Sequence, residues 1–165
     1  MLIAIISDLH DNLVNLEKCL TWCQQNKIGK IICCGDVGNI TTLKFLSTNF
    51  SGEIFLVTGN AETYDTDNLA SLKNITYFGE LGQINIGGLN IGFCHKDQEI
   101  PGLIKKSSET FNFIFYGHSH RPWLEKKNGI QIANPGNLAN IFYPATFAIL
   151  ETANSHLELK LIDKL

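Results

Sequence analysis

The chain has 165 residues, of which 44% are hydrophobic and 18% are charged, and its formal charge is −3. A chain of this length buries about 70% of the surface that its unfolded form exposes, which is enough for one core, so we expect a single domain over residues 1–165. With this slight negative charge there is no sign of the basic face that binding to a nucleic acid polymer uses, so we expect no such partner.

The first ten residues, MLIAIISDLH, contain an apolar run that is too short for a signal peptide or a membrane span, and no basic residue precedes it. We therefore expect a cytoplasmic protein without membrane association. The five cysteines make an odd set, and we expect them to be reduced. Cys19 and Cys23 are one helical turn apart, but no second pair of Cys or His accompanies them, so packing is favoured over metal binding.

Short apolar runs alternate with helical patterns in the first half of the chain. Strands are predicted at residues 2–7, 30–34 and 54–58, which are rich in Ile and Val. Helices are predicted at residues 11–25, with leucines at helical spacing, and more weakly at 41–48. This βαβαβ order predicts parallel strands that are buried on both faces.

The second half of the chain contains glycine-rich strand pairs. Gly87-Gly88 and Asn128-Gly129 separate alternating runs and indicate hairpin turns. A helix is predicted to begin near Pro101, and two antiparallel strands are expected at residues 146–151 and 156–162. The predicted fold class is α/β, with two stacked mixed β-sheets flanked by helices in a four-layer αββα sandwich.

The residues that follow the apolar runs are oxygen and nitrogen ligands. In chain order these residues are Asp8, His10, Asp36, Asn60, His95, His118 and His120. Each one alone is typical of a helix cap, a turn or a structural histidine. Together, at the carboxyl ends of strands in one α/β sheet system, they indicate a site for divalent Mn, Fe or Zn. Seven ligands are too many for one ion.

The order D-x-H, G-D, G-N, H and G-H-x-H extends across nearly the whole chain and resembles the calcineurin-like metallophosphoesterases. The short length is similar to their single-domain bacterial and archaeal phosphodiesterase branch. The NPGN sequence at residues 134–137 also resembles the N-P-G-S loop of that branch, with Asn in place of Ser.

The resemblance implies two divalent ions, with Mn favoured and Fe, Zn, Ni and Co as alternatives. It assigns the first ion to Asp8, His10 and His120. It assigns the second ion to Asn60, His95 and His118. Asp36 bridges the two ions, and a shared anionic ligand agrees with the physics because two ions about 3.5–4 Å apart repel each other.

The implied activity is hydrolysis of a small phosphodiester by a hydroxide that bridges the two ions. The residues to which the resemblance gives catalytic roles are Asp8, Asp36, Asn60 and His95. A homo-oligomer is an open alternative to a monomer. Phe142 and Tyr143 would support a dimer if exposed, but a packed core pair is the favoured interpretation.

Three positions depart from the family pattern or stand out beside it. The third motif usually reads G-N-H-D or G-N-C-D, whereas Ala61 here has no proton to give. General acid catalysis contributes roughly 10² to 10⁴ in rate, so poor leaving groups should suffer most. Lys96 follows His95 where Gly is common, and a solvated lysine is favoured there. Arg121 is the chain's one arginine, and chance placement is favoured over substrate contact.

Two alternatives of other classes are open. The retromer complex contains a phosphoesterase-like subunit of similar size that acts mainly as a scaffold, and Ala61 is compatible with such a role. That scaffold departs from the family within the G-D and G-N motifs, whereas all seven ligand positions are intact here. A weaker alternative is a nucleotide-binding or regulatory module that holds metal without turnover.

Overall fold

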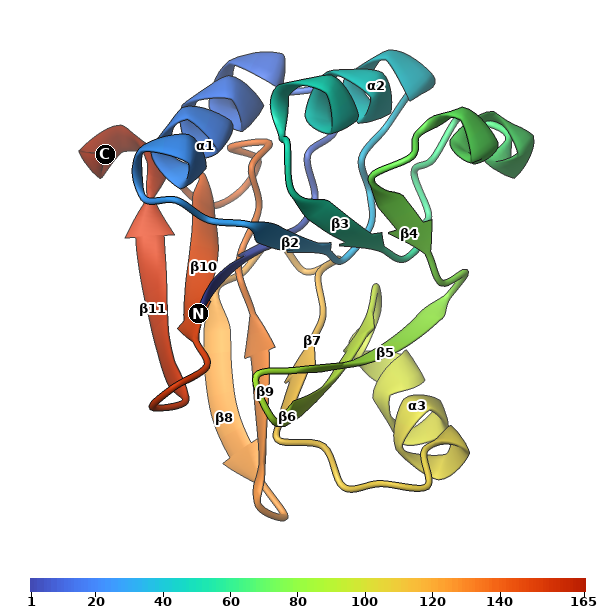
Figure 1. Cartoon of the computed structure of the whole chain (residues 1–165), viewed down its shortest axis with the longest axis vertical. Coiled ribbons are helices and arrows are strands. Elements are labelled where there is room, and N and C mark those ends of the chain that lie inside the picture. The colour runs from blue at the N-terminus through green and yellow to red at the C-terminus, as the bar shows by residue number, and fades with distance from the viewer.

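A computed structural model describes all 165 residues, which form two β-sheets packed face to face with helices on the outer faces (Figure 1). The strands of the larger sheet are β1 (Leu2–Ile6), β2 (Lys30–Cys33), β3 (Glu53–Leu56), β4 (Ile75–Tyr77), β10 (Thr146–Glu151) and β11 (His156–Leu161). Their order is β11-β10-β1-β2-β3-β4. Strands β1 to β3 are parallel, as the βαβαβ order predicts, and β10 and β11 are antiparallel to their neighbours, as expected of the final strand pair. Strand β4, which the sequence pattern does not predict, adds a fourth parallel strand next to β3.

The smaller sheet contains the glycine-rich strand pairs. Its strands are β5 (Leu81–Ile86), β6 (Leu89–Cys94), β7 (Phe113–Phe115), β8 (Trp123–Lys127) and β9 (Ile130–Asn134), in the order β5-β6-β7-β9-β8. Both predicted hairpins are confirmed. Asn128 and Gly129 have φ angles of 52° and 84°, and Gly87 and Gly88 also have positive φ, which is the backbone that a two-residue hairpin turn needs.

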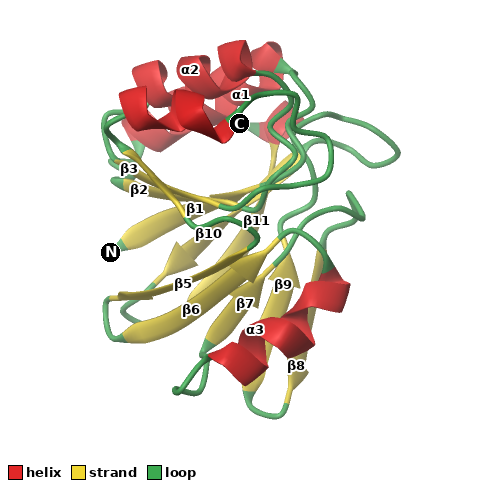
Figure 2. Ribbon diagram, turned by 90° about the vertical axis from the view of Figure 1, so that its right-hand side faces the viewer, coloured by secondary structure: helices red, strands yellow, loops and turns green.

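Helices cover both outer faces of the sandwich, which gives the predicted four layers (Figure 2). The α-helices are α1 (Leu13–Gln25), α2 (Ile40–Asn49) and α3 (Ile100–Lys106), and the 3₁₀ segments are η1 (Thr66–Ser71), η2 (Asp97–Glu99) and η3 (Ile162–Lys164). Helices α1 and α2 lie on the larger sheet and α3 on the smaller one. Helix α1 begins at Leu13 and not at residue 11 as predicted, because the Asn12 side chain accepts the Asn15 amide and caps the N-terminus of the helix.

Three buried clusters hold the strands in place, one of which joins the smaller sheet to α3. Between the sheets, Ile5 and Phe55 of the larger sheet belong to one buried cluster with Phe93 and Phe115 of the smaller sheet. A second cluster joins the outer face of the larger sheet to α1 and α2, and Cys19 and Cys23 are among its fully buried members. All five cysteines are free and buried, which agrees with a packing role.

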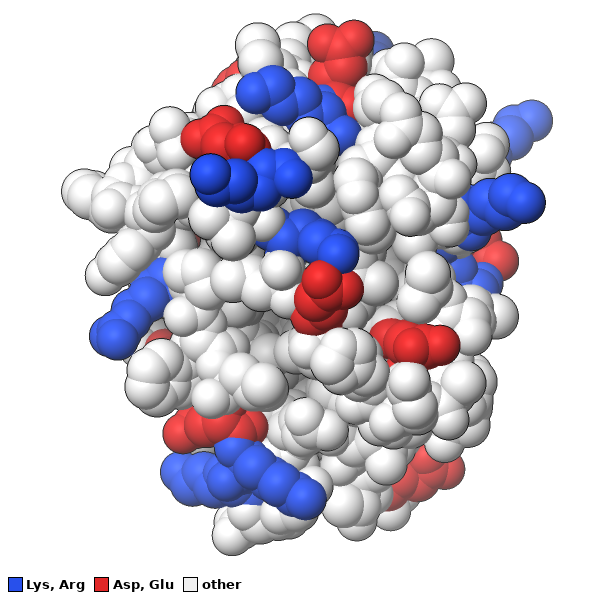
Figure 3. Space-filling view, turned by 90° about the vertical axis from the view of Figure 1, so that its left-hand side faces the viewer, with Lys and Arg blue, Asp and Glu red and all other residues white.

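The two sheets expose an edge strand on the same side of the molecule, β8 in one sheet and β11 in the other. Every residue of β8 is exposed, and basic and acidic side chains are interspersed on this face (Figure 3). Charged side chains on edge strands oppose pairing with other chains. No helix of the protein combines the length and the apolar character that crossing a membrane requires.

The segment after the NPGN loop does not enter the core. Phe142 is 90% exposed and Tyr143 is 40% exposed, so the prediction of a packed aromatic pair is wrong. The reason is the path of the backbone, because continuous burial begins only at Ala145, next to the start of β10.

Candidate metal centre

The seven predicted ligands lie in the loops that leave β1, β2, β3, β6 and β7. Parallel strands bring their carboxyl ends to one edge of a sheet, and the stacked sheets bring two such edges together. Six of the seven fall into two clusters of ligand-type side chains, in each of which the ligand atoms lie within 4.8 Å of one another. These clusters are Asp8, His10 and His120 in one and Asp36, His95 and His118 in the other.

The first cluster is built around a fully buried carboxylate. Asp8 Oδ1 lies 3.4 Å from His120 Nε2 and 3.9 Å from His10 Nε2. The two imidazole Nε2 atoms are 3.1 Å apart. The backbone amide of His118 donates to both oxygens of Asp8, which fixes the carboxylate in place. Three ligand atoms therefore converge on one point.

The second cluster contains Asn60 as well. His95 Nε2 lies 3.1 Å from Asn60 Oδ1 and 3.3 Å from Asp36 Oδ2. The ring of His118 packs against that of His95 with a centroid separation of 5.1 Å. One carboxylate oxygen, one amide oxygen and two imidazoles thus surround the second point.

The two oxygens of Asp36 have different surroundings. Oδ1 accepts the backbone amides of Asn60 and Ala61, at 2.7 and 2.8 Å. Oδ2 lies 3.5 Å from His10 Nε2 in the first cluster and 3.3 Å from His95 Nε2 in the second. A single oxygen of Asp36, Oδ2, therefore lies between the two clusters, while Oδ1 is held by backbone amides.

The buried carboxylates of the centre stabilise positively charged groups beside them. Burial by itself would raise the pKa of Asp36, but hydrogen bonding and charge from His95 and the two loop amides lower it to about 2. The pKa of His95 is raised, because its interactions with Asp36 outweigh burial. A hydrogen bond to Asp8 raises the pKa of His120 against a smaller effect of burial. Buried carboxylates therefore make this a site for cations.

Two histidines are oriented by backbone carbonyls. His95 Nδ1 lies 2.8 Å from the Cys34 carbonyl, and His120 Nδ1 lies 3.4 Å from the Ile141 carbonyl. A carbonyl can only accept, so each Nδ1 carries the proton and donates it. The Nε2 atoms that face the carboxylates are then free to act as ligands, which is the orientation that metal-binding histidines usually show.

The backbone of the centre is unusual. Five predicted ligands have φ between 42° and 65°, a region that residues other than glycine rarely adopt. These five are Asp8, His10, Asp36, His118 and His120. Two positions close to these ligands require glycine. A Cβ on Gly59 would collide with the Asp36 carboxylate, and a Cβ on Gly117 would collide with Ser7. Such strain is concentrated at functional sites.

Two asparagines of the NPGN loop, for which the sequence pattern predicts no role, support the centre. Asn134 is buried and donates to the carbonyl of Gly117 at 2.7 Å. Asn137 is also buried, donates to the carbonyl of His120 at 3.1 Å and accepts the amide of Ile141. The signal that could identify them in the sequence is the NPGN motif itself.

Glu62 holds the loop that carries Asn60. Its Oε1 accepts the Gly59 amide at 3.0 Å, while its Oε2 is buried without a hydrogen-bond partner. Burial raises the pKa of Glu62. The backbone amide of the neighbouring Ala61 donates to Asp36, but its methyl side chain cannot donate a proton to a leaving group.

Lys96 and Arg121 lie outside the two clusters. Lys96 is in the bend after β6, where its backbone amide donates to Glu99 at 2.9 Å. The Arg121 guanidinium lies over the exposed ring of Trp123, 5.0 Å from its centroid. This stacking gives Arg121 a structural partner in the protein itself.

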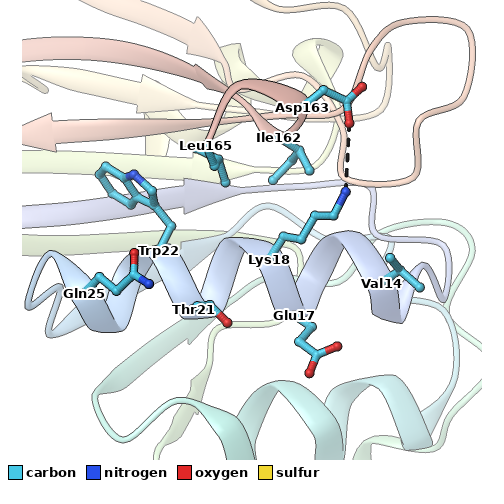
Figure 4. A pocket seen from close by; sticks show the side chains of 9 residues that line it. All are labelled: Val14, Glu17, Lys18, Thr21, Trp22, Gln25, Ile162, Asp163 and Leu165. Atoms are coloured by element: carbon cyan, nitrogen blue, oxygen red, sulfur yellow. Dashed lines mark ion pairs between the residues drawn. The ribbon is translucent and has the colours of Figure 1, made fainter.

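A surface cavity of about 630 Å³ lies elsewhere, between α1 and the C-terminal segment (Figure 4). Lys18 and Asp163 form an ion pair of 4.0 Å across it, beside Trp22 and Ile162. None of the seven predicted ligands lines this cavity. The seven predicted ligands are therefore gathered at the strand ends and not in this cavity.

Known proteins resemble this chain over most of its length. A phosphodiesterase of Methanocaldococcus jannaschii is 24% identical over 156 residues, which cover 92% of this chain and 93% of that protein. The solved structure of an archaeal phosphodiesterase superposes with a TM-score of 0.86 at 22% identity and covers 98% and 99% of the two chains. Vps29 of Entamoeba histolytica, in complex with Zn²⁺, has a TM-score of 0.66 at 18% identity, with 97% of each chain covered.

These structural likenesses confirm the fold. The family is shown by the model of the calcineurin-like phosphoesterase superfamily domain, which matches residues 1–155 of this chain. That span contains every predicted ligand, from the loop after β1 to the loop after β7. The chain therefore belongs to the calcineurin-like phosphoesterase superfamily.

Proposed function

We propose that the protein is a metal-dependent phosphodiesterase that hydrolyses a small phosphodiester at a centre of two divalent ions. The observation that carries the proposal is the placement of Asp36 Oδ2, 3.5 Å from His10 in one cluster and 3.3 Å from His95 in the other. A shared anionic atom is what two neighbouring cations need. The similarity to phosphodiesterases in sequence and fold supports the same activity.

The residues present fit such ions. Carboxylate, amide oxygen and imidazole are the donors that Mn, Fe and Zn accept, and no thiolate lies in either cluster. Asp8, His10 and His120 would hold one ion. Asn60, His95 and His118 would hold the other, with Asp36 shared. When bound, the ions would stabilise the charge on the phosphoryl group and supply an activated water, and we favour manganese.

The ligand side chains would hold the ions in fixed positions, and residue 61 would not supply a proton. Backbone amides hold the Asp36 and Asp8 carboxylates, so neither is free to move during the reaction. Ala61 has no proton to offer a leaving group, although the family pattern places His or Cys there. The proposal therefore favours diesters whose leaving group is stable as an anion.

A scaffold is the second candidate. Ala61 favours it, and so does the structural likeness to Vps29, a protein whose name refers to vacuolar protein sorting. Because that Vps29 is a Zn²⁺ complex, metal content alone does not separate an enzyme from a scaffold. Turnover must be measured.

The test compares a diester with a monoester. We expect the protein, after treatment with EDTA and dialysis, to be inactive and to regain hydrolysis of bis(p-nitrophenyl) phosphate when manganese is added. The rate on p-nitrophenyl phosphate should be lower than the rate on the diester. A higher rate on the monoester would contradict phosphodiesterase specificity, and no turnover of either ester with two ions bound would favour the scaffold.

A further inference from the structure

Phe142 is the most exposed of the large apolar side chains of the protein, and it lies beside the candidate metal centre. Phe142 is 90% exposed, and its ring centroid is 5.9 Å from that of His120, at an interplanar angle of 49°. Ile141 and Tyr143, its neighbours in the chain, are also exposed, and a contiguous exposed apolar patch is typical of a surface that binds another molecule. The side chain therefore needs an explanation.

The backbone holds this ring outward at a further cost. The Tyr143 amide donates to the Ile141 carbonyl at 2.8 Å, which makes a three-residue turn centred on Phe142, and Phe142 has a φ of 62°. A bulky residue at positive φ is an outlier, and this form of the turn is rare and strained. A second turn of the same form is centred on His118. There the Ser119 amide donates to the Gly117 carbonyl at 2.7 Å, and His118 has a φ of 65°.

The turn is fastened to the metal centre itself. His120 Nδ1 donates to the carbonyl of Ile141, the residue before Phe142. Asn137 accepts the Ile141 amide and donates to the carbonyls of His120 and Tyr143, at 3.1 and 3.3 Å. The position of the Phe142 ring is thus tied to that of a predicted ligand on both sides of the turn.

We propose that Phe142 is a specificity-determining residue that stacks on a planar aromatic group of the substrate, such as a nucleobase or an aryl ring. This inference rests on the proposed function, because a phosphate held at the centre would bring its ester groups to the rim where Phe142 stands. The half-exposed side chains of Ile141 and Tyr143 extend the apolar surface on either side of the ring. The substrate class is then an aryl or nucleoside phosphodiester rather than a dialkyl diester.

The experiment measures binding, so it does not depend on turnover. Dissociation constants of AMP and ribose 5-phosphate are measured by calorimetry on the manganese-loaded protein, since the two probes share the sugar phosphate and differ in the base. Stacking of one base on an aromatic ring is expected to make AMP bind on the order of tenfold tighter. Phe142→Ala should remove most of that ratio without changing the affinity for ribose 5-phosphate.

Three further variants sharpen the result. Phe142→Trp should keep the ratio, and AMP, but not ribose 5-phosphate, should quench the added indole fluorescence. Phe142→Leu should fall between Ala and Trp, because it keeps apolar area without the ring face. Ile104→Ala removes a 42% exposed apolar side chain from α3 and should leave the ratio unchanged.

The two proposals fail in different ways. Equal affinities for AMP and ribose 5-phosphate in the parent, or an unchanged ratio in Phe142→Ala, would overturn the stacking role while leaving phosphate binding intact. If neither probe binds and no diester is hydrolysed, the proposed function fails as well. If neither probe binds but diesters are hydrolysed, the stacking role alone is wrong.

Discussion

Replacing Asp36 by Asn is expected to lower the rate of diester hydrolysis on the order of 10²-fold or more and to weaken the binding of both ions. Even groups that only support metal ligands usually cost about 10–100-fold in metal affinity when they are changed, and a shared ligand should exceed this. The shared negative charge at Oδ2 disappears in the amide. The check is kcat at saturating manganese, together with metal content after dialysis.

The structure adds a second reason for a large effect of Asp36→Asn. Oδ1 accepts the amides of Asn60 and Ala61, so an asparagine can satisfy either these donors or the ions, but not both. Asp163→Asn is the matched control, because its carboxylate is 77% exposed and pairs only with Lys18. If Asp36→Asn hydrolyses the diester as fast as the parent at saturating manganese, the bridging role is wrong.

Replacing Ala61 by His is expected to raise activity selectively. For diesters with poor leaving groups, such as alkyl or nucleoside esters, the gain should be on the order of tenfold or more, since general acid catalysis contributes roughly 10² to 10⁴. Nitrophenyl esters leave without help and should gain little. The measurement is the dependence of log kcat/KM on leaving-group pKa, which should be less steep in Ala61→His than in the parent.

The control for this gain is Ala61→Asn, which adds a polar side chain that cannot transfer the proton. The backbone amide at this position still donates to Asp36 in both variants, so the ligand geometry is kept. Equal slopes for parent and Ala61→His would reject the missing-acid explanation. Glu62, whose pKa is raised by burial, would then be the next residue to test as the proton source.

The positions of the ligands could be predicted because they follow from strand ends. Once βαβαβ is assigned, the carboxyl ends of parallel strands must meet, and Asp8 and Asp36 follow neighbouring strands β1 and β2. The hairpins were predictable for a similar reason, since Asn-Gly readily adopts the positive φ that a tight two-residue hairpin turn needs at both positions. Both the ligand positions and the hairpin turns therefore follow from short stretches of the sequence.

Other features depend on contacts between segments far apart in the chain. Which oxygen of Asp36 faces both clusters depends on where the loop after β3 places the amides of Asn60 and Ala61. The roles of Asn134 and Asn137 depend on the loop after β7, which they support. Phe142 was expected in the core because it is aromatic, but a strained turn and a hydrogen-bonded neighbour hold it in solvent.

The central claim is that two ions share Asp36 and that hydrolysis needs both. The most direct measurement is a titration of metal-free protein with manganese, at protein concentrations well above the dissociation constants, while the initial rate of bis(p-nitrophenyl) phosphate hydrolysis is followed. The account predicts that the rate rises until about two equivalents per chain are present and is constant beyond that point. A plateau at one equivalent, or no hydrolysis after two ions have bound, would contradict it.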